Sequence, residues 1–289
     1  MTVLSQISNA MQALVEKTAS RVVSLNPTRR NAASGILWRA GLIVTADEAL
    51  DDDEGVEVMM PDGGVAAATL VGRDPSTDIA LLRVEARFET SESFQPAIAV
   101  KAGHLAVAVG RTGSGELATS GIVKECSGSW RSWASGLIDR RILLDLALDR
   151  RSHGGAVVDA EGDLIGLAAF APRHRALVIP VETVDRIAER LATSGSIAHG
   201  YLGVGLHPIR DEGASGAIVV RLDENGPGKR AGILVGDILT AWNGEAIRGV
   251  RDVFKRLGPD AVGSTITFDV MRANQQTKVE VAVGERPLK

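Results

Sequence analysis

The sequence contains a single cysteine, Cys126, so no disulfide can form within one chain. It has no apolar run long enough for a helix that crosses a bilayer. The opening stretch from Met1 to Ala19 has neither a basic start nor a continuous apolar segment, so it does not resemble a secretory signal. These absences predict a soluble cytoplasmic protein, or a periplasmic one if the chain has already lost a signal.

Neither sign of charge dominates the sequence. Its 32 Lys and Arg residues nearly balance 36 Asp and Glu residues, which gives a formal net charge of -4. This balance argues against broad electrostatic attraction to nucleic acid or to anionic lipid. The length of 289 residues suits two domains of about 100–200 residues each.

Three stretches of the chain differ in pattern. In residues 1–20, apolar side chains recur at helical spacing, which predicts an amphipathic helix docked on the next domain, with partner binding as the alternative. Residues 21–194 carry short β-prone runs, and a helical pattern closes this stretch after Pro180. A small polar segment then leads into residues 195–289, a β-rich stretch with one helical stripe at Val250, Val253, Phe254 and Leu257.

The β-prone runs of the central stretch are short and separated by turn-forming residues. They lie at 22–25, 41–45, 56–60, 79–84, 104–109, 142–148, 156–158, 164–168 and 177–179. Many short strands without long helices between them predict a β-barrel or a β-sandwich.

Three segments in order carry a resemblance to the HtrA (Deg) family of trypsin-like proteases. Residues 34–50 resemble the strand and turn that bring the catalytic histidine, whose position holds Glu48 here. Residues 74–82 resemble the strand that brings the orienting aspartate, and Asp78 is retained. Residues 144–159 resemble the Gly-Asn-Ser-Gly-Gly nucleophile loop, in which the serine position holds His153 and the leading glycine position holds Arg151.

The end of the chain resembles a PDZ domain of the HtrA type. Residues 226–244 contain the Ala-Gly-hydrophobic, Gly-Asp-hydrophobic and Asn-Gly series of that domain, and Asn243-Gly244 suits a tight type I′ hairpin turn. Residues 201–206 resemble its carboxylate-binding loop. The resemblance implies peptide binding by strand addition, with these residues in contact with the peptide: Tyr201, Leu202, Gly203, Val204, Val250 and Phe254.

Together the two resemblances imply a mainly β fold. They predict an N-terminal helix in residues 1–20, a trypsin-like double six-stranded β-barrel with a closing helix in 21–194, and an α+β PDZ domain in 195–289. They imply no cofactor.

The substitutions predict that the family's chemistry is lost. Peptide hydrolysis by this mechanism needs a hydroxyl nucleophile, a base, a carboxylate that holds the base, and N–H donors for the oxyanion. Asp78 supplies the carboxylate, but Glu48 and His153 supply neither base nor hydroxyl, and Arg151 replaces a glycine in the oxyanion loop. If the fold is kept, Glu48, Asp78 and His153 converge, and they form either a charge network or a divalent-metal site.

Three hypotheses for function follow. The first is a pseudoprotease that binds C-terminal or extended peptides of other proteins through its PDZ domain. The second is a scaffold or regulatory subunit of an active HtrA-type relative. Many HtrA proteins are trimers joined through aromatic residues near the N-terminus, but the first aromatic residue here is Trp38. The third is an enzyme after all, a serine endopeptidase whose nucleophile loop is assigned wrongly or whose chemistry has changed.

Overall fold

The computed structural model describes residues 2–26, 32–39, 41–50, 55–85, 94–132, 136–173, 175–209 and 216–286 of the chain. The chain forms two compact units, the first made of residues 1–130 and 137–196 and the second of residues 131–136 and 197–289, so the main division falls between Ser196 and Ile197. From the sequence we placed this boundary at residues 194 and 195. Among the described helices, none is long and apolar enough to span a membrane.

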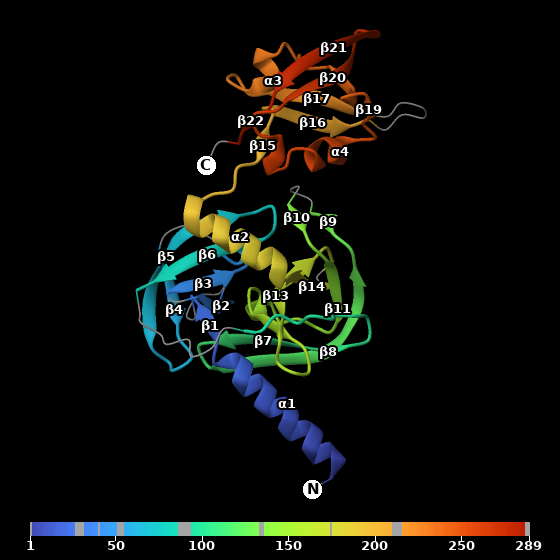
Figure 1. The fold of residues 1–289 in the computed structure, drawn as a ribbon. Helices are drawn as coiled ribbons and strands as arrows, with labels where there is room; N and C mark the ends of the chain where they lie inside the picture. Colours follow the sequence, from blue (N-terminus) through green and yellow to red (C-terminus); the bar gives the residue numbers. More distant parts are fainter. Residues whose placement is uncertain are drawn as a thin grey trace. The chain divides into compact units, whose positions relative to one another are not determined.

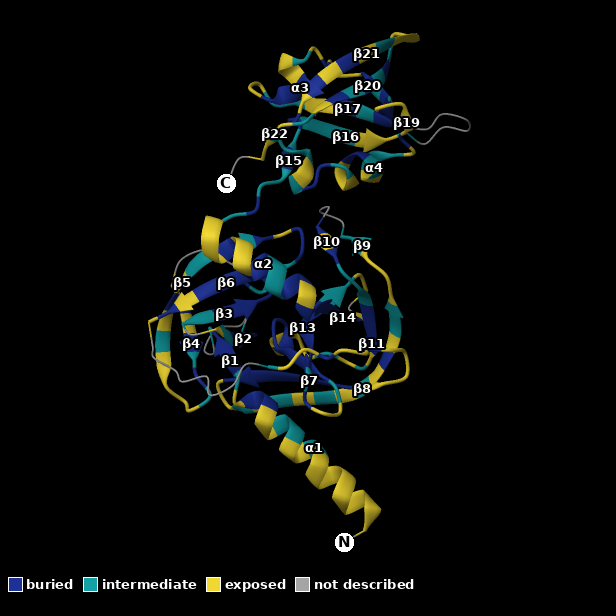
Figure 2. Ribbon diagram, viewed as in Figure 1, coloured by how far each residue is buried: buried dark blue, intermediate teal, exposed yellow. Residues whose placement is uncertain are grey.

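The chain begins with helix α1 (Val3–Ala19), as the apolar spacing predicted. Thr2 caps it, since its Oγ1 accepts a hydrogen bond from the N–H of Ser5 at 3.2 Å. Burial along the helix is uneven: Thr18 and Ala19 in its last turn are buried, while the first turns are exposed (Figure 2).

The first barrel closes in the strand order β1-β2-β3-β6-β5-β4 (Figure 1). Its strands are β1 (Val22–Leu25), β2 (Ala33–Arg39), β3 (Leu42–Thr45), β4 (Val56–Met59), β5 (Val65–Asp74) and β6 (Ile79–Val84). Apolar side chains from every strand meet inside it, and among them Val23, Ile43 and Leu82 are fully buried. A short 3-10 helix, η1 (Asp47–Ala49), follows β3 and carries Glu48.

The second barrel closes in the order β11-β14-β13-β12-β7-β8. Its strands are β7 (Leu105–Thr112), β8 (Gly115–Ser127), β11 (Arg141–Asp145), β12 (Ala156–Val158), β13 (Leu164–Ala171) and β14 (Arg175–Pro180). The short strands β9 (Trp130–Arg131) and β10 (Leu137–Ile138) pair with each other, and the 3-10 helix η2 (Arg150–Ser152) precedes His153. Two closed six-stranded barrels confirm the mainly β, double-barrel fold predicted from the sequence.

Helix α2 (Val181–Ser194) closes the first unit, where the helical pattern after Pro180 predicted a helix. It contacts β5 and β6 of one barrel and β13 and β14 of the other. Its buried side chains include the predicted stripe of Val181, Val184, Ile187, Ala188 and Leu191. The helix therefore links the two barrels through its apolar face.

The second unit is a sheet with short helices at its margins. Its strands are β15 (Gly200–Tyr201), β16 (Val204–Pro208), β17 (Ala217–Leu222), β18 (Ile238–Trp242), β19 (Glu245–Ala246), β20 (Thr265–Arg272), β21 (Gln275–Ala282) and β22 (Gly284–Glu285). Its helices are α3 (Pro227–Arg230), α4 (Val250–Lys255) and the 3-10 helix η3 (Pro259–Ala261). The main sheet has the order β16-β17-β18-β20-β21, so β16 lies at an edge.

The Asn-Gly turn of this unit forms where the sequence predicted it. Trp242 pairs with Glu245 across the turn, and the two residues between them, Asn243 and Gly244, have φ angles of 49° and 81°. Two positive φ angles in a two-residue loop are the geometry of a type I′ turn. The core beneath the sheet is built around Phe268, which meets Trp242 edge-to-face at 5.1 Å between ring centroids.

Candidate functional site

The first unit brings Asp78 and His153 into contact between the two barrels. Asp78 lies at the turn before β6, and His153 lies directly after η2. The Asp78 Oδ2 and the His153 Nε2 are 3.1 Å apart, which is a hydrogen bond, and an ion pair when the imidazole is protonated. The carboxylate at the orienting position thus holds an imidazole, but one that comes from the nucleophile position.

Asp78 is fixed in place by a small network of hydrogen bonds one turn earlier. The buried carboxylate of Asp74 accepts from the Ser76 N–H at 3.0 Å, the Ser76 hydroxyl at 2.7 Å and the Thr77 hydroxyl at 2.7 Å. This turn gives Asp78 a φ of 59°, in the left-handed region that few non-glycine residues adopt. The turn therefore aims the Asp78 carboxylate at the site.

Glu48 reaches Asp78 through its backbone. The Glu48 N–H donates to Asp78 Oδ1 at 2.8 Å. Glu48 belongs to the 3-10 helix η1, and an ion pair between the buried Asp47 of this helix and Arg73 of β5 holds η1 against the barrel. Partial burial, followed by repulsion from the Asp78 charge, raises the pKa of the Glu48 carboxyl, and His153 partly opposes the shift.

His153 is held from several sides. It is 7% exposed, and its ring packs edge-to-face on Phe170 of β13 with 5.2 Å between ring centroids. Its carbonyl accepts from the Ser34 N–H at 2.9 Å. The next residue, Gly154, passes so close to β2 that a Cβ there would lie 2.3 Å from the Ser34 carbonyl oxygen. The imidazole is therefore packed into the site and is not a mobile surface group.

The loop before His153 uses its own backbone N–H groups. In serine proteases the nucleophile N–H and the N–H two residues earlier bind the oxyanion, and these positions are His153 and Arg151 here. The Arg151 N–H donates to Asp149 Oδ1 at 2.8 Å, and the His153 N–H donates to the Arg150 carbonyl at 3.1 Å. Both groups are therefore engaged inside the turn, so neither is free to bind an oxyanion in this conformation.

The Arg151 side chain reinforces this closed turn. Its Nε donates to Asp149 Oδ1 at 3.0 Å and its Nη2 donates to Asp149 Oδ2 at 2.9 Å. The hydrogen bonds from Arg151 lower the pKa of the Asp149 carboxyl to about 2. Among the described residues, Arg151 is not one of those with positive φ, so the turn avoids the backbone strain that replacing a glycine would otherwise bring.

Ser152 is the hydroxyl next to His153, but it faces away from the site. It is buried, and a Cβ on Gly110 of β7 would lie 2.5 Å from its Oγ. Because Ser152 packs on β7, it is not placed as a substitute nucleophile.

The metal hypothesis has no geometric support in the described residues. Within them, no group of three or more His, Cys, Asp or Glu side chains has an arrangement that could hold a metal ion. His153 contacts the Asp78 carboxylate directly, whereas Glu48 reaches the other Asp78 oxygen through its backbone N–H.

In the second unit, residues 201–204 form the loop before the edge strand β16. The Gly203 carbonyl accepts from the Asp223 N–H at 2.8 Å, and Gly203 has a φ of 67°. Within the described part of the chain, the N–H groups of Leu202 and Gly203 donate to no backbone carbonyl. Two such amides before an open strand edge are what a terminal carboxylate needs.

The predicted peptide contacts in residues 201–204 differ in burial, since Leu202 and Gly203 are buried while Tyr201 and Val204 are partly buried. Leu202 is 2% exposed and belongs to the core, while Val204 is partly buried against that core. The Tyr201 hydroxyl donates to the Asp223 carboxylate, and this bond raises the pKa of Tyr201. The Tyr201 side chain thus anchors the loop, which leaves its backbone for contact with a ligand.

The predicted apolar stripe is divided between the core and the surface, and its last member, Leu257, follows the end of helix α4. Val253 and Leu257 are buried members of the core, whereas Val250 is partly buried and Phe254 is 39% exposed. The helix contacts β16. Val250 and Phe254 therefore belong to the face beside the edge strand, a division that the helical spacing alone did not give.

Comparisons with known proteins agree with this architecture. Residues 33–167 match the family of the trypsin-like peptidase domain, and residues 200–283 match the PDZ domain. The fold and these matches define the class, a trypsin-like peptidase domain followed by a PDZ domain. With the relatives described next, they show that the chain belongs to the HtrA (Deg) family.

The curated relatives are longer than this chain. The probable periplasmic serine endoprotease DegP-like of Brucella suis is 33% identical over 269 residues, covering 87% of this chain and 52% of the relative. The periplasmic serine endoprotease DegP of Escherichia coli K12 is 30% identical over 270 residues, covering 87% of this chain and 56% of the relative. The chain thus spans about half the length of the curated relatives it matches.

Solved structures share the fold across almost the whole chain. The HtrA-type protease AlgW with a decapeptide has a TM-score of 0.73 at 22% identity, covering 96% of this chain and 98% of its own. The serine endoprotease from Yersinia pestis has a TM-score of 0.73 at 25% identity, with the same coverage.

Proposed function

We propose that this HtrA-family chain does not hydrolyse peptide bonds and that it binds peptides of other proteins through its PDZ domain. One observation carries the first half of this proposal. The nucleophile position holds His153, which is bonded to Asp78, and the N–H groups of the surrounding loop are bonded within the loop.

The site lacks the hydroxyl nucleophile and the imidazole base that peptide hydrolysis by this mechanism requires. An imidazole at position 153 offers no hydroxyl for an acyl ester, and Glu48 places a carboxyl where the mechanism needs an imidazole base. Loss of a triad nucleophile costs on the order of 10⁶ in turnover, and the residual activity depends on the oxyanion hole. Because the N–H groups of Arg151 and His153 are engaged, that residual contribution is also absent from this conformation.

The second unit supports peptide binding. Strand β16 is at the edge of the described sheet, so an extended peptide can add to it through backbone hydrogen bonds. The N–H groups of Leu202 and Gly203 donate to no backbone carbonyl among the described residues, so they can donate to the terminal carboxylate of a peptide. Val250 and Phe254 supply apolar surface for the side chains of the peptide. We infer that the ligands are C-terminal or extended segments with apolar side chains.

The names of the relatives suggest a cellular compartment for this chain. The Brucella and Escherichia coli relatives are named as periplasmic proteins. We therefore propose the periplasm for this chain, and the cytoplasmic expectation gains no support. Fractionation of cells that make the protein, with a marker for each compartment, tests this assignment.

Cleavage of an unfolded protein substrate, read by mass spectrometry with and without divalent metal, tests the loss of hydrolysis. The control is the triple variant Glu48→His, Arg151→Gly, His153→Ser, which restores the family's residues. We expect no cleavage of the substrate by the natural chain and cleavage by the triple variant, because the barrels and Asp78 are in place. Cleavage by the natural chain would show that the assignment of these positions is wrong.

Fluorescence anisotropy with a library of C-terminal peptides tests the binding. Each peptide is compared with its C-terminal amide, which removes the carboxylate but leaves the side chains. We expect binding that weakens at least about tenfold on amidation, since the terminal charge is then lost. A library with no binder would refute the PDZ part of the proposal without touching the argument about hydrolysis.

A further inference from the structure

Strand β16 offers two different faces to a peptide that adds to its edge. Val204 and Leu206 pack against the core that also contains Val253 of helix α4. Gly205 lies between them, and side chains alternate along a strand, so Gly205 faces away from the core. A peptide residue that lies opposite Gly205 therefore places its side chain on this outer face.

The direction of the peptide decides which of its residues lies opposite Gly205. The loop with the N–H groups of Leu202 and Gly203 precedes β16, so a peptide that places its carboxylate there runs antiparallel to this strand. Its last residue then lies beside Val204 and points to the core face. The penultimate residue lies beside Gly205, and its side chain points to the outer face.

Arg221 of β17 lies on the same outer face. It is the partner of Gly205 across β16 and β17, and a Cβ on Gly205 would lie 3.0 Å from the Arg221 Cβ. Because Gly205 has no side chain, the space over β16 is open to the Arg221 side chain, which is 77% exposed. Neighbouring strands are about 4.8 Å apart, so the backbone of an added peptide lies about 9.6 Å from that of β17. A long arginine and an acidic side chain of the peptide together span this distance.

The positive charge of Arg221 remains available to a ligand. Among the described residues its acidic partner is Asp223, with 3.7 Å between Nη2 and Oδ1, which is too long for a hydrogen bond. The Asp223 carboxylate accepts instead from the Tyr201 hydroxyl. That bond raises the pKa of Tyr201, and the charges of Arg221 and Arg286 partly oppose the rise. Both guanidinium groups are therefore close enough to the loop before β16 to favour negative charge there.

We propose that Arg221 selects peptides whose penultimate residue is acidic. The selection rests on the peptide binding proposed above, and it adds a second requirement to that of apolar side chains. The Arg221 guanidinium donates to the Asp or Glu carboxylate of the ligand across the open space over Gly205. A Lys or Arg at the same ligand position is repelled by Arg221 and is disfavoured.

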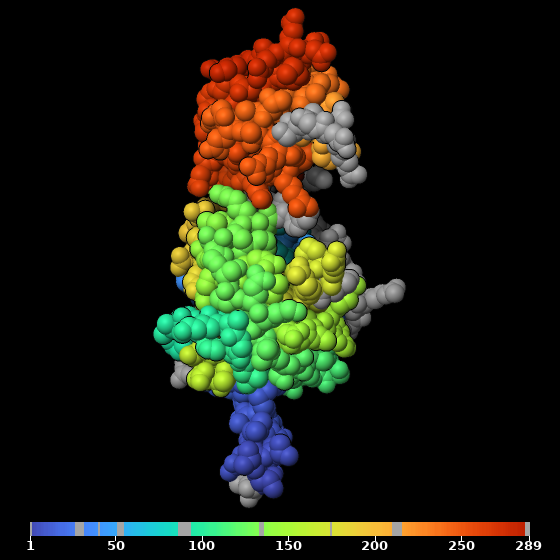
Figure 3. All heavy atoms as spheres, turned by 90° about the vertical axis from the view of Figure 1, so that its right-hand side faces the viewer, coloured from blue at the N-terminus to red at the C-terminus, as the bar shows by residue number. Residues whose placement is uncertain are grey.

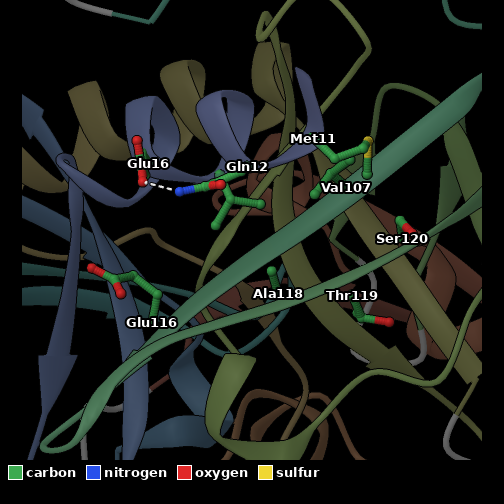
Figure 4. A pocket seen from close by; sticks show the side chains of 9 residues that line it. Met11, Gln12, Glu16, Val107, Glu116, Ala118, Thr119 and Ser120 are labelled. Carbon is green, nitrogen blue, oxygen red and sulfur yellow. Dashed lines mark hydrogen bonds between the residues drawn. The ribbon is translucent and has the colours of Figure 1, made fainter. Parts of the chain in front are cut away.

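The first unit has a groove in which a peptide also finds room, and the charge of that groove is opposite. The groove, of about 390 Å³, lies between α1 and the strands β7 and β8 (Figure 4). The first turns of α1 extend beyond the barrel surface on the face shown in Figure 3. Glu16 of the helix and Glu116 of β8 line the groove, so a peptide bound there would prefer basic residues to acidic ones. The sign of the charge preference therefore distinguishes this groove from the edge of β16.

Fluorescence anisotropy on the full chain tests the selection with peptides that differ only at the penultimate position. All the peptides have the same apolar last residue, and the residue before it is Glu, Gln or Lys. We expect the Glu peptide to bind about two- to fivefold more tightly than the Gln peptide, which is the range of an exposed ion pair. The Lys peptide should bind more weakly than the Gln peptide, and high salt should reduce both differences.

Two variants and one matched control connect the preference to Arg221. Arg221→Gln should make the affinities for the Glu and Gln peptides equal, and Arg221→Glu should make the Lys peptide the tightest of the three. The control Lys278→Gln removes a positive charge from β21, at the opposite edge of the main sheet. The Lys278 side chain is also 77% exposed and lies 4.0 Å from one acidic residue, Asp269. The control should therefore keep the preference of the natural chain.

A wrong role for Arg221 gives a different result from an absent peptide site. If the natural chain binds the Glu and Gln peptides equally, or if Arg221→Gln leaves the preference in place, Arg221 does not select the ligand, while peptide binding itself stands. A natural chain that prefers the Lys peptide also overturns the role of Arg221 and points to the groove beside α1. If no peptide binds more tightly than its C-terminal amide, the carboxylate site is absent and both proposals fall.

Discussion

The closed turn at Asp149–His153 gives a prediction that separates loop geometry from the identity of the catalytic residues. The perturbation is Asp149→Ala in a chain that already carries Glu48→His and His153→Ser. This background restores base and nucleophile but keeps Arg151, so the turn can still close on Asp149. If closure blocks the oxyanion site, removing the Asp149 carboxylate should increase the reactivity of the restored serine.

The contacts of Asp149 set the size of the effect. Its bond to the Arg151 N–H is a capping contact, worth about 1 kcal/mol. The pair with the Arg151 side chain adds little, because the two side chains are 49% and 42% exposed and water screens them. The closed turn is thus favoured by about 1 kcal/mol through the capping contact, and its removal should raise the open population about fivefold.

Labelling of the restored serine by a fluorophosphonate, followed by intact-protein mass spectrometry, measures this change. The phosphonyl oxygen of the product needs the same N–H donors as an oxyanion. The matched control is Arg150→Ala, a neighbouring exposed arginine whose side chain takes no part in the contacts of Asp149. Equal labelling rates with and without Asp149 would refute the view that this carboxylate holds the oxyanion site closed.

Other predictions concern stability and binding. Glu48→Gln should raise the Tm by about 1 °C at pH 7. The raised pKa of Glu48 means that the folded state favours the protonated carboxyl, so the ionised carboxylate destabilises the fold at this pH. The difference in Tm between the variant and the natural chain should vanish as the pH falls through that pKa. Asp237→Asn should cost about 1.5 kcal/mol in urea denaturation, because it removes the charge from the hydrogen bonds that the buried Asp237 carboxylate accepts from the partly exposed Arg272. Gly203→Ala should weaken peptide binding at least about tenfold by anisotropy, since its Cβ would lie 2.6 Å from the Gly226 Cα, while Gly249→Ala, with nothing within 4 Å, should bind normally.

Much of the fold could be predicted from the sequence, because the buried strands are short apolar runs. Each run noted in residues 21–194 corresponds to a strand, among them β1, β6, β12 and β14. Strand β8 was not predicted from the sequence, because it is not a continuous apolar run. Exposed residues alternate along it with less exposed ones, and the exposed ones include Glu116, Ser120 and Lys124. Strand β5 was missed for a similar reason, as the alanine-rich start of Val65–Asp74 has weak β-propensity.

The site was less accessible to sequence reasoning. The order of three segments indicated that Asp78 and His153 would meet, and they lie in contact. The roles of Asp149 and Phe170 could not be foreseen, because one depends on a local turn and the other on a ring that approaches from β13. An Asp two residues before an Arg in a loop rich in polar residues was the one available signal for a capped turn.

The substitutions at the site compensate one another, which is why they should be reversed together. In an active triad the carboxylate at position 78 holds an imidazole from position 48, and here it holds one from position 153. Replacing His153 alone would leave Asp78 facing Glu48, whose pKa is already raised by burial and then by that neighbour. Arg151 likewise occupies the glycine position and supplies the guanidinium that Asp149 binds. The imidazole that Asp78 binds thus comes from another position of the chain, and the residues around it, Glu48 and Arg151, differ from the family's pattern together with it.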